Sequence, residues 1–556
     1  MARKATRSSG PEAGWAALND GRWEDARTAF AAALEVEERP DSLEGLSWAA
    51  WWQDDESTVF AARERAFRLY RSGGDVASAA RMATWLAADQ LDFHGATAVA
   101  SGWLRRARRL LADLEPRADH GWLDFHEGYL AYVLGDTDRS MELSRRAAEL
   151  GRRLDVADLA ILGLALRGAV LVACAEVDRG MDCLDEATAA ALGGDVEIPI
   201  ARAWACCFLV SACEAVRDYE RAFEWCDRIA EFADRYGGRY MLGFCRQHYG
   251  AVHVWRGEWA EAEAQLEAAV DAYSLSRPAF ARGPLAALAE LRRRQGRWDD
   301  AERLLDRVDA GSALVCRAWL ALDRGASRRA VELAQRALRR TDGARSLLRV
   351  PALEVLVAAH VARAELEEAR AALPELDDLA RIGGTRPLRA AAALAGGMVA
   401  TAGGDHDHAR RLLEDAVDAF ERSGAPFDAA RARIELAGCL IALRRNDDAA
   451  RELEASVATL ARLGAEAEAR RARRLLDEPA QDRQAETLGD ITRRERDVLR
   501  LLAEGLTNRE IADRLSVSPH TIHRHIANIL RKLDLTNRTA AAAHAVRAGL
   551  LDSSSA

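Results

Sequence analysis

The most conspicuous shortage in this sequence is lysine, which occurs only at Lys4 and Lys532 among 556 residues. A phosphate-binding loop of the form G-x-x-x-x-G-K-[ST] needs a lysine that reaches the β- and γ-phosphates of a nucleotide. Neither lysine stands in such a context. The sequence therefore excludes a nucleotide-hydrolysing module of this type, and we expect no cofactor.

Aromatic residues are also scarce, at 6% of the chain. Alanine, leucine, arginine and glutamate dominate instead, and this mixture favours helix over β-sheet. The body shows no strand pattern, which excludes a phosphoacceptor receiver domain, because that domain needs alternating strands and helices. The 556 residues far exceed the size at which a single core stops growing. We therefore predict an all-α protein made of several domains or of repeats.

Long apolar runs and paired cysteines are missing too. No stretch approaches the roughly 18 to 20 uninterrupted apolar residues of a membrane helix. The start of the chain, Met1 to Gly10, is basic and polar, with no apolar segment behind it. The nine cysteines include no C-x-x-C pair, which fits a reducing compartment. We expect a soluble, cytoplasmic protein that does not associate with a membrane.

Candidate metal-binding and catalytic residues are few. We interpret the cysteines as small buried apolar residues, while Cys206, Cys207 and Cys213 leave redox sensing or metal binding as alternatives. No Ser/His/Asp or Cys/His constellation is recognisable, so we expect no metal, no catalytic residue and no enzyme. Two histidine pairs lack a third and fourth ligand at zinc-motif spacing: His406 with His408, and His248 with His253.

The net charge of −10 is unevenly distributed. Residues 488–556 contain eleven Lys or Arg against eight Asp or Glu, a balance of +3. The rest of the chain contains 67 against 80, a balance of −13. Because an acidic body repels a polyanion and a basic tail attracts it, any nucleic-acid contact should lie at the C-terminal end.

A pattern of glycine, an aromatic residue, an acidic residue and alanine recurs along the body. It is clearest at Asp20–Ala26, Arg256–Ala262 and Gln295–Ala301. Most steps between copies are close to 40 residues, which predicts twelve pairs of helices stacked into a solenoid over residues 12–476. The alanine-equivalent positions are 26, about 62, about 100, 140, 180, 222, 262, 301, 330, 369, 409 and 449.

The G-x-W/Y-x-x-A signature resembles tetratricopeptide repeats, or the slightly longer repeats in the sensor region of MalT-like regulators. Such a solenoid offers a concave surface for an effector, which is a peptide, a protein or a small molecule. Residues 1–11 and 553–556 are expected to be tails. Residues 477–487 are charged, contain a proline and have almost no apolar residues, so we predict a linker there.

A compact domain is predicted over residues 488–552. Thr492-Arg-Arg-Glu495 and Thr507-Asn-Arg-Glu510 are two capping boxes, each of which opens a helix. Ser518 caps a third helix that has Pro519 at its first position. A fourth helix is expected from about Asn537 to Leu551. A short helix, a turn and a longer helix with a basic outer face are typical of a helix-turn-helix that reads the major groove.

This domain is strongly similar to the LuxR/NarL-type helix-turn-helix. The matching stretches are Ile491–Leu499, Gly505–Ala512, Ser518–His525, Lys532–Leu533 and Gly549–Leu551. The resemblance implies base contacts from His523, Arg524 and Ala527 on the exposed face of the third helix. It implies phosphate contacts from Thr507, Asn508, Thr521, Lys532 and Arg538. The implied DNA-binding residues are Thr507, Asn508, Ser518, His520, Thr521, His523, Arg524, Ala527, Lys532 and Arg538.

One position departs from the family. His523 stands where the family most often has lysine, and a neutral histidine is a weaker major-groove reader. His525 matches a position that the family commonly fills with histidine, and we expect it to orient backbone or core. Glu495 and Glu510 are expected to act as helix caps.

The resemblance implies a bacterial, sequence-specific transcription regulator of double-stranded DNA, with the repeats as a sensor or interaction region. In the family the fourth helix supplies a homodimer contact, and activation through RNA polymerase is a commoner role than repression. The alternative is a tetratricopeptide-like scaffold that the helix-turn-helix localises to DNA. A sensor predicts one compact pocket, whereas a scaffold predicts a long open groove.

Overall fold

The computed structural model describes residues 11–236, 238–308, 311, 313–341, 346–488, 491–547 and 550. Every regular element in this part of the chain is a helix, and no strand occurs in it. The predicted all-α fold class is confirmed. The tails predicted at 1–11 and 553–556 lie outside the described residues, except Pro11, which begins the first helix.

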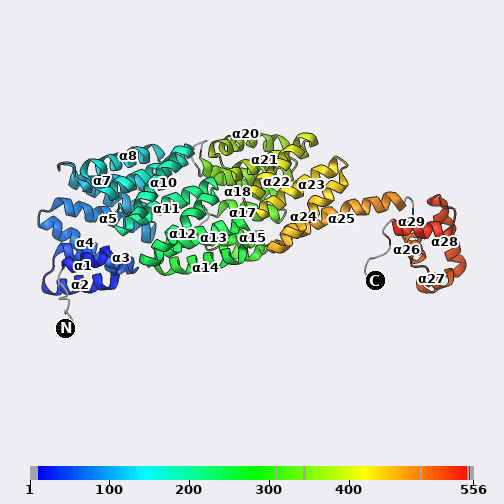
Figure 1. Cartoon of the computed structure of the whole chain (residues 1–556), viewed down its shortest axis with the longest axis horizontal. Coiled ribbons are helices and arrows are strands. Elements are labelled where there is room, and N and C mark those ends of the chain that lie inside the picture. The colour runs from blue at the N-terminus through cyan, green and yellow to red at the C-terminus, as the bar shows by residue number, and fades with distance from the viewer. Residues whose placement is uncertain are drawn as a thin grey trace.

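Residues 11–463 form helical hairpins that follow one another along the chain (Figure 1), twelve of them within the described ranges. Each second helix packs on its own partner, and successive hairpins stack. The first six hairpins are α1 (Pro11–Asn19) with α2 (Trp23–Val36), α3 (Pro40–Trp52) with α4 (Glu56–Ser72), α5 (Val76–His94) with α6 (Thr97–Leu111), α7 (Ala118–Leu134) with α8 (Thr137–Leu154), α9 (Ala157–Ala173) with α10 (Val177–Gly193), and α11 (Pro199–Val216) with α12 (Tyr219–Tyr236).

The second half of the array repeats this arrangement, with short 3-10 turns ahead of two hairpins. These turns are η1 (Pro278–Ala281) and η2 (Leu347–Arg349). The hairpins are α13 (Arg239–Arg256) with α14 (Trp259–Ser276), α15 (Arg282–Arg294) with α16 (Trp298–Leu305), α17 (Leu314–Asp323) with α18 (Ser327–Leu338), α19 (Val350–Ala362) with α20 (Leu366–Gly383), α21 (Arg386–Ala402) with α22 (His406–Arg422), and α23 (Pro426–Ala442) with α24 (Asn446–Leu463).

The turn inside each hairpin explains the repeated sequence pattern. Between α13 and α14, Gly257 has a φ of 77°, a left-handed conformation that glycine adopts without strain. Trp259 is 4% exposed, and its indole N–H donates to the Val254 carbonyl oxygen at 3.1 Å. Ala262, five residues after the glycine, is fully buried. The small alanine therefore lets the second helix approach the first closely.

The second repeat corrects one predicted position. Its turn is formed by Asp54, with a φ of 60°, and the buried residue five positions later is Val59. The predicted equivalent near Ala62 lies almost one helical turn further on. A valine at the position that is usually small, and an aspartate in place of the turn glycine, hid the equivalence in the sequence.

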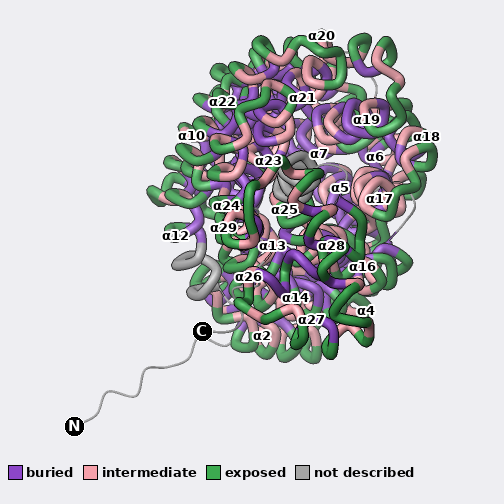
Figure 2. Tube along the Cα trace, turned by 90° about the vertical axis from the view of Figure 1, so that its right-hand side faces the viewer, coloured by how far each residue is buried: buried purple, intermediate pink, exposed green. Residues whose placement is uncertain are grey.

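The hairpins wind into a superhelix in which distant segments touch. Arg217 Nη2 lies 2.6 Å from Glu354 Oε2, and the Trp255 indole N–H donates to the Ser423 carbonyl oxygen at 3.0 Å. These pairs are 137 and 168 residues apart in sequence. Seen along the long axis, exposed residues line the outer rim and buried residues lie toward the inside (Figure 2). The winding therefore brings the first helices of different hairpins face to face.

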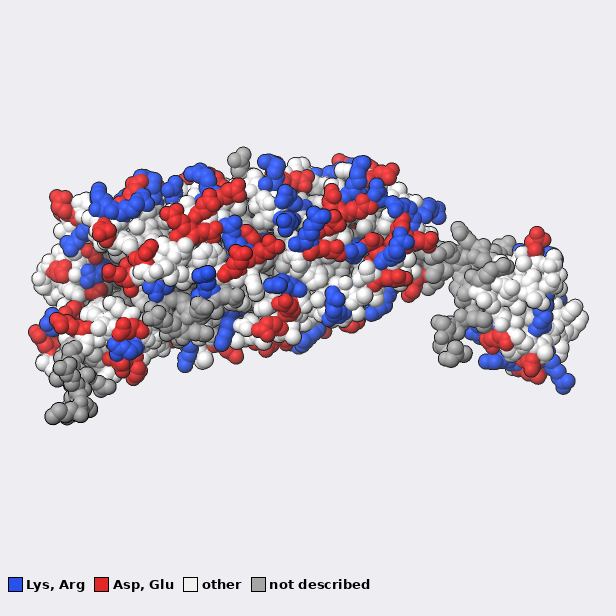
Figure 3. All heavy atoms as spheres, in the orientation of Figure 1, with Lys and Arg blue, Asp and Glu red and all other residues white. Residues whose placement is uncertain are grey.

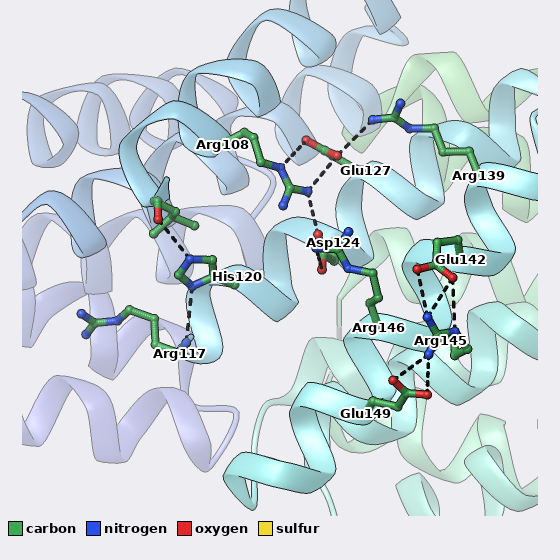
Figure 4. A network of polar contacts seen from close by, with 11 residues as sticks. Arg108, Arg117, His120, Asp124, Glu127, Arg139, Glu142, Arg145, Arg146 and Glu149 are labelled. Atoms are coloured by element: carbon green, nitrogen blue, oxygen red, sulfur yellow. Dashed lines mark hydrogen bonds and ion pairs between the residues drawn. The ribbon is translucent and has the colours of Figure 1, made fainter. Parts of the chain in front are cut away.

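Ion pairs also join successive helices (Figure 4). Arg108 Nη2 of α6 lies 2.6 Å from Asp124 and 2.9 Å from Glu127 of α7. From α8, Arg139 reaches Glu127 at 3.2 Å and Arg146 reaches Asp124 at 3.0 Å. Because Asp124 is almost fully buried, water screens its pairs little, and three helices are held together at one point.

Helix α25 (Glu466–Leu488) follows the last hairpin and packs at its beginning against α23 and α24. It continues through residues 477–487, the stretch predicted as a linker, which is therefore helical. Residues 477–487 include both charged residues and residues with high helix propensity. Their lack of apolar residues is therefore compatible with a coil and with a helix.

Five of the nine cysteines are buried and the other four are partly buried, and none forms a disulfide. Burial raises the pKa of Cys206 to about 12, so this thiol is protonated at neutral pH. Cys206 and Cys213, which are both buried, confirm the interpretation as small packed residues. They belong to α11, the one helix in the described ranges that is long and apolar enough to cross a membrane. Of this helix, 72% is buried inside the fold, as in a core helix.

Candidate DNA-binding site

Four helices after α25 form a domain with its own core. They are α26 (Arg493–Ala503), α27 (Asn508–Leu515), α28 (Pro519–Lys532) and α29 (Arg538–Arg547). The predicted inward residues Ile522, Ile526 and Ile529 are buried and belong to this core. The core is separate from the clusters that fill the repeats, so its packing does not depend on the solenoid.

Both predicted capping boxes are present. The Glu495 backbone N–H donates to Thr492 Oγ1 at 3.3 Å, and the Thr492 backbone N–H donates to Glu495 Oε2 at 2.9 Å. Thr507 and Glu510 repeat the arrangement at 3.4 and 2.7 Å. These bonds satisfy backbone donors that have no partner within the helix, and they fix where α26 and α27 begin.

A tight turn connects α27 to α28. Ser516 has a φ of 53° and ends α27 in the left-handed conformation. Ser518 Oγ accepts the Thr521 backbone N–H at 3.1 Å, and Pro519 is the first residue of α28. A short helix, a tight turn and a longer helix make up the helix-turn-helix motif.

The outer face of α28 is basic and open to solvent. His520, His523, Arg524 and Ala527 are exposed, and Thr521 is half-buried. The helix contains no aspartate or glutamate. The structure thus brings together on one face the residues predicted to contact bases, and His525, predicted to orient backbone or core, is half-buried beside them.

Lys532 has a contact that the sequence did not reveal. Its Nζ lies 2.7 Å from Glu495 Oε2, and the two side chains are 25% and 4% exposed. Burial alone would raise the pKa of Glu495, but hydrogen bonds from Lys532 and Thr492 outweigh it and lower that pKa. The end of α28 is therefore fastened to the start of α26. The predicted phosphate contact of Lys532 stays a prediction.

Two further arginines hold the motif together. Arg538 donates to Asn508 Oδ1 at 2.7 Å and to the Leu506 carbonyl oxygen. Arg494 Nη2 donates to the Leu515 carbonyl oxygen at 2.6 Å. Arg538 and Asn508, both predicted phosphate contacts, are thus neighbours at the start of α27. The role of Arg494 was missed, because no local pattern links it to a carbonyl 21 residues away.

The fourth helix is described over part of its predicted length. It spans Arg538–Arg547, and residues 548, 549 and 551 of the predicted range from about Asn537 to Leu551 lie outside the described residues. Ala541 and Ala545 pack into the core, whereas Val546 is 53% exposed.

Two of the four histidines considered for metal binding, His248 and His253, have carboxylate neighbours. His248 Nδ1 lies 2.7 Å from Glu214 Oε2, and His253 Nδ1 lies 2.5 Å from Glu258 Oε2. Over the described ranges, no group of three or more His, Cys, Asp or Glu side chains could hold a metal ion.

Comparison with known proteins assigns the C-terminal domain. The model of the family described as bacterial regulatory proteins, luxR family, matches residues 490–545. LiaR, a transcriptional regulatory protein of Bacillus subtilis, is 47% identical over 62 residues, which are 11% of this chain and 29% of LiaR. The nitrate/nitrite response regulator NarP of Escherichia coli is 51% identical over 51 residues, 9% of this chain and 24% of NarP.

Each of the relatives named here is matched over less than a third of its own length. A putative HTH-type transcriptional regulator of Mycobacterium bovis is 45% identical over 67 residues, and the match spans 8% of its length. Among solved structures, yeast Tom70 covers 79% of this chain and 98% of its own, with 14% identity and a TM-score of 0.33. The family match and the observed geometry agree on the same residues. The chain therefore carries a LuxR-family helix-turn-helix domain at its C-terminal end, behind a solenoid of helical repeats.

Proposed function

We propose that this protein is a sequence-specific DNA-binding transcription regulator that places α28 in the major groove of double-stranded DNA. The observation that carries the proposal is the exposed face of α28, which presents Arg524 and two histidines and has no acidic residue in the helix. A helix of this width and charge fits the major groove, where base edges are distinguishable.

The contacts divide into two groups. His523, Arg524 and Ala527 face the base edges, since they lie on the exposed side within the first two to three turns of α28. Phosphate contacts come from the two ends of α28 and from the elements around it, and they position the helix but carry no sequence information. The phosphate-facing group is Thr507, Asn508, Ser518, His520, Thr521, Lys532 and Arg538.

The repeat region is proposed to be a sensor rather than a second DNA-binding surface. On the face shown in Figure 3, acidic and basic side chains are intermingled across the repeats. A balance of −13 outside residues 488–556 also disfavours a polyanion. The winding supports a compact pocket over a long open groove, since contacts such as Arg217 to Glu354 cross the inside of the superhelix. The scaffold function is the alternative.

We further propose that the protein acts in the cytoplasm as a homodimer joined through α29. The exposed Val546 on that helix, at 53%, offers apolar surface for a second copy. A two-fold dimer would bind a palindromic site and activate transcription through RNA polymerase. Neither the dimer nor the polymerase contact is needed for the DNA contact itself.

Genome-wide mapping of bound DNA tests the proposal. The intact chain should occupy a limited set of promoters with a shared palindromic motif, and an Arg524→Ala chain should lose them. A chain without residues 12–476 should keep the motif but lose its response to growth conditions. Occupancy without a shared motif would contradict sequence-specific regulation.

A further inference from the structure

A cavity of about 360 Å³ lies inside the second half of the superhelix. Its lining residues come from the first helices of successive hairpins, α15, α17, α19, α21 and α23, from the start of α16, and from α25. A Cβ built at Gly296 would lie 3.2 Å from Ala467, so the turn before α16 touches the start of α25. Helix α25 therefore closes one side of this space, which we call the α25 cavity. Its volume lies in the range of small-molecule sites, about 300 to 1,000 Å³.

Flat apolar surfaces line part of the α25 cavity. Trp298, Trp319 and Phe427 belong to its wall. The guanidinium carbon of Arg431 lies 4.9 Å from the Trp319 ring centroid and 6.0 Å from that of Phe427. The indole nitrogen of Trp298 is buried and has no hydrogen-bond partner among the described residues. A buried donor of this kind suits a ligand acceptor, because unsatisfied buried donors are unfavourable.

The arginines of the cavity differ in how far they are neutralised. Arg293 is paired with Glu290 and with Asp323, each at 2.7 Å. For Arg431, the carboxylate partner among the described residues is Asp428, at the longer distance of 3.9 Å. Arg293 is therefore a structural charge, whereas Arg431 is available to an anion entering the cavity.

Helix α25 adds further positive charge at the mouth. Arg470 and Arg474 lie one helical turn apart and are exposed, and no ion pair joins either of them to a carboxylate in the described ranges. Arg471 between them is held by Glu435 at 2.6 Å. Glu290 and Asp428, which are not among the lining residues, also pair with Arg294, at 2.8 and 3.3 Å. The lining itself contains six arginines and three carboxylates: Arg293, Arg294, Arg431, Arg470, Arg471 and Arg474 with Asp323, Glu435 and Glu468.

We propose that the α25 cavity binds a small organic anion that carries a flat aromatic ring. The ring lies against Trp319, and the phosphate or carboxylate group meets Arg431 and Arg474. Arginine suits this role because its planar guanidinium forms bidentate hydrogen bonds with oxyanions and also stacks on aromatic rings.

The position of α25 gives the site a regulatory consequence. The helix lines the cavity with residues between Ala467 and Arg474 and continues to Leu488. Leu488 is three residues before Ile491, the first core residue of the DNA-binding domain. A ligand that binds more tightly to one position of α25 shifts this helix, and α25 leads to the DNA-binding domain. This step rests on the proposed function, since its effect is a change in DNA affinity.

Calorimetric titration of the full chain with 1-naphthyl phosphate tests the binding step. The phosphate ester should bind once per chain, about tenfold or more tighter than 1-naphthol or inorganic phosphate, because only the ester offers both a ring and a charge. Equal affinity for 1-naphthol, equal affinity for inorganic phosphate, or no binding of the ester would overturn the proposal.

A matched pair of variants locates the site. Arg474→Gln and Arg431→Gln should each weaken binding of 1-naphthyl phosphate about tenfold. Arg473→Gln, which alters the neighbouring exposed arginine outside the cavity lining, should leave it unchanged. Circular dichroism confirms that the variants fold. If Arg473→Gln and Arg474→Gln had equal effects, the ligand would lie elsewhere.

Promoter binding by the same proteins separates this inference from the proposed function. The ester should change the affinity of the intact chain for promoter DNA at least about threefold, and not that of Arg474→Gln. DNA binding that is intact but unaffected by the ester would overturn the regulatory step while leaving the DNA-binding function in place. Loss of DNA binding altogether would contradict the proposed function instead.

Discussion

Lys532 Nζ lies 2.7 Å from Glu495 Oε2, and this ion pair ties the last residue of α28 to the capping box that opens α26. Glu495 is 3% exposed, so loss of its partner leaves a buried carboxylate. Lys532→Met should lower the free energy of unfolding of the C-terminal domain by about 1 to 3 kcal/mol. Urea unfolding followed by circular dichroism measures the change, and a difference below about 0.3 kcal/mol would contradict it.

The same pair predicts a pH dependence. The pKa of Glu495 is lowered in the folded state from its ordinary value of 4.5. Its stabilising contribution is therefore complete above that value and is lost as the pH falls below it. Glu495→Gln, which keeps a capping acceptor, should flatten the acid limb of the stability curve. An unchanged acid limb would show that the carboxylate does not titrate in this range.

DNA titrations on these two variants decide whether Lys532 also meets a phosphate. If it does, Lys532→Met should lower the slope of log affinity against log salt by about 1, because one phosphate fewer is neutralised. Glu495→Gln should not lower that slope. Equal slopes in both variants and the parent would confine Lys532 to its structural role.

Thr507 combines two roles that conservative substitution can separate. Its hydroxyl caps α27 by accepting the Glu510 backbone N–H, and it is a predicted phosphate contact. Thr507→Ala should destabilise the domain by about 0.5 to 2 kcal/mol and weaken DNA binding, whereas Thr507→Ser should retain most of both. If the serine variant were as unstable as the alanine variant, the hydroxyl would not be the stabilising group.

The separate core of α26 to α29 predicts that a fragment of residues 488–556 folds and binds DNA. It should show cooperative thermal unfolding and shift promoter DNA at low salt. The shift should be weaker than that of the intact chain, because one domain on a single half-site binds weakly. A fragment of residues 12–476 should not shift the same DNA. The reverse result would move the DNA-binding function into the repeats.

Nucleotide hydrolysis should be absent, because neither Lys4 nor Lys532 stands in a phosphate-binding loop. Purified protein should not hydrolyse ATP above the rate of a blank, as measured by phosphate release. Hydrolysis that co-purifies with the chain through size-exclusion chromatography would reveal a site that the sequence did not indicate.

Much of the fold could be predicted because its determinants are local. A turn residue in the left-handed conformation and a small residue five positions later, as in Gly257 and Ala262, recur in most hairpins. The capping boxes at Thr492 and Thr507 were equally visible, since each is complete within four residues. Periodicity and capping chemistry act over one or two helical turns, so a single sequence displays them.

The contacts that were not predicted join residues far apart in sequence. The ion pair between Arg217 and Glu354 depends on the angle between successive hairpins. Many small packing contacts determine that angle together. The ion pair between Lys532 and Glu495 likewise depends on how α28 packs against α26 in the folded domain. The α25 cavity was not predictable for the same reason. Its walls come together when the hairpins wind into a superhelix, and no local sequence motif marks them.

The most direct test of the central claim compares Arg524→Ala with the intact chain in competition titrations on cognate and random DNA at several salt concentrations. Arg524 is exposed on the outer face of α28, so its loss should cost about 1 to 3 kcal/mol on the cognate site and much less on random DNA. Arg500→Ala, on the face of α26 that carries Glu504, should leave both affinities unchanged. Equal weakening on both DNAs, with helical content preserved, would make Arg524 a phosphate contact and contradict the assignment of α28 as the base-reading helix.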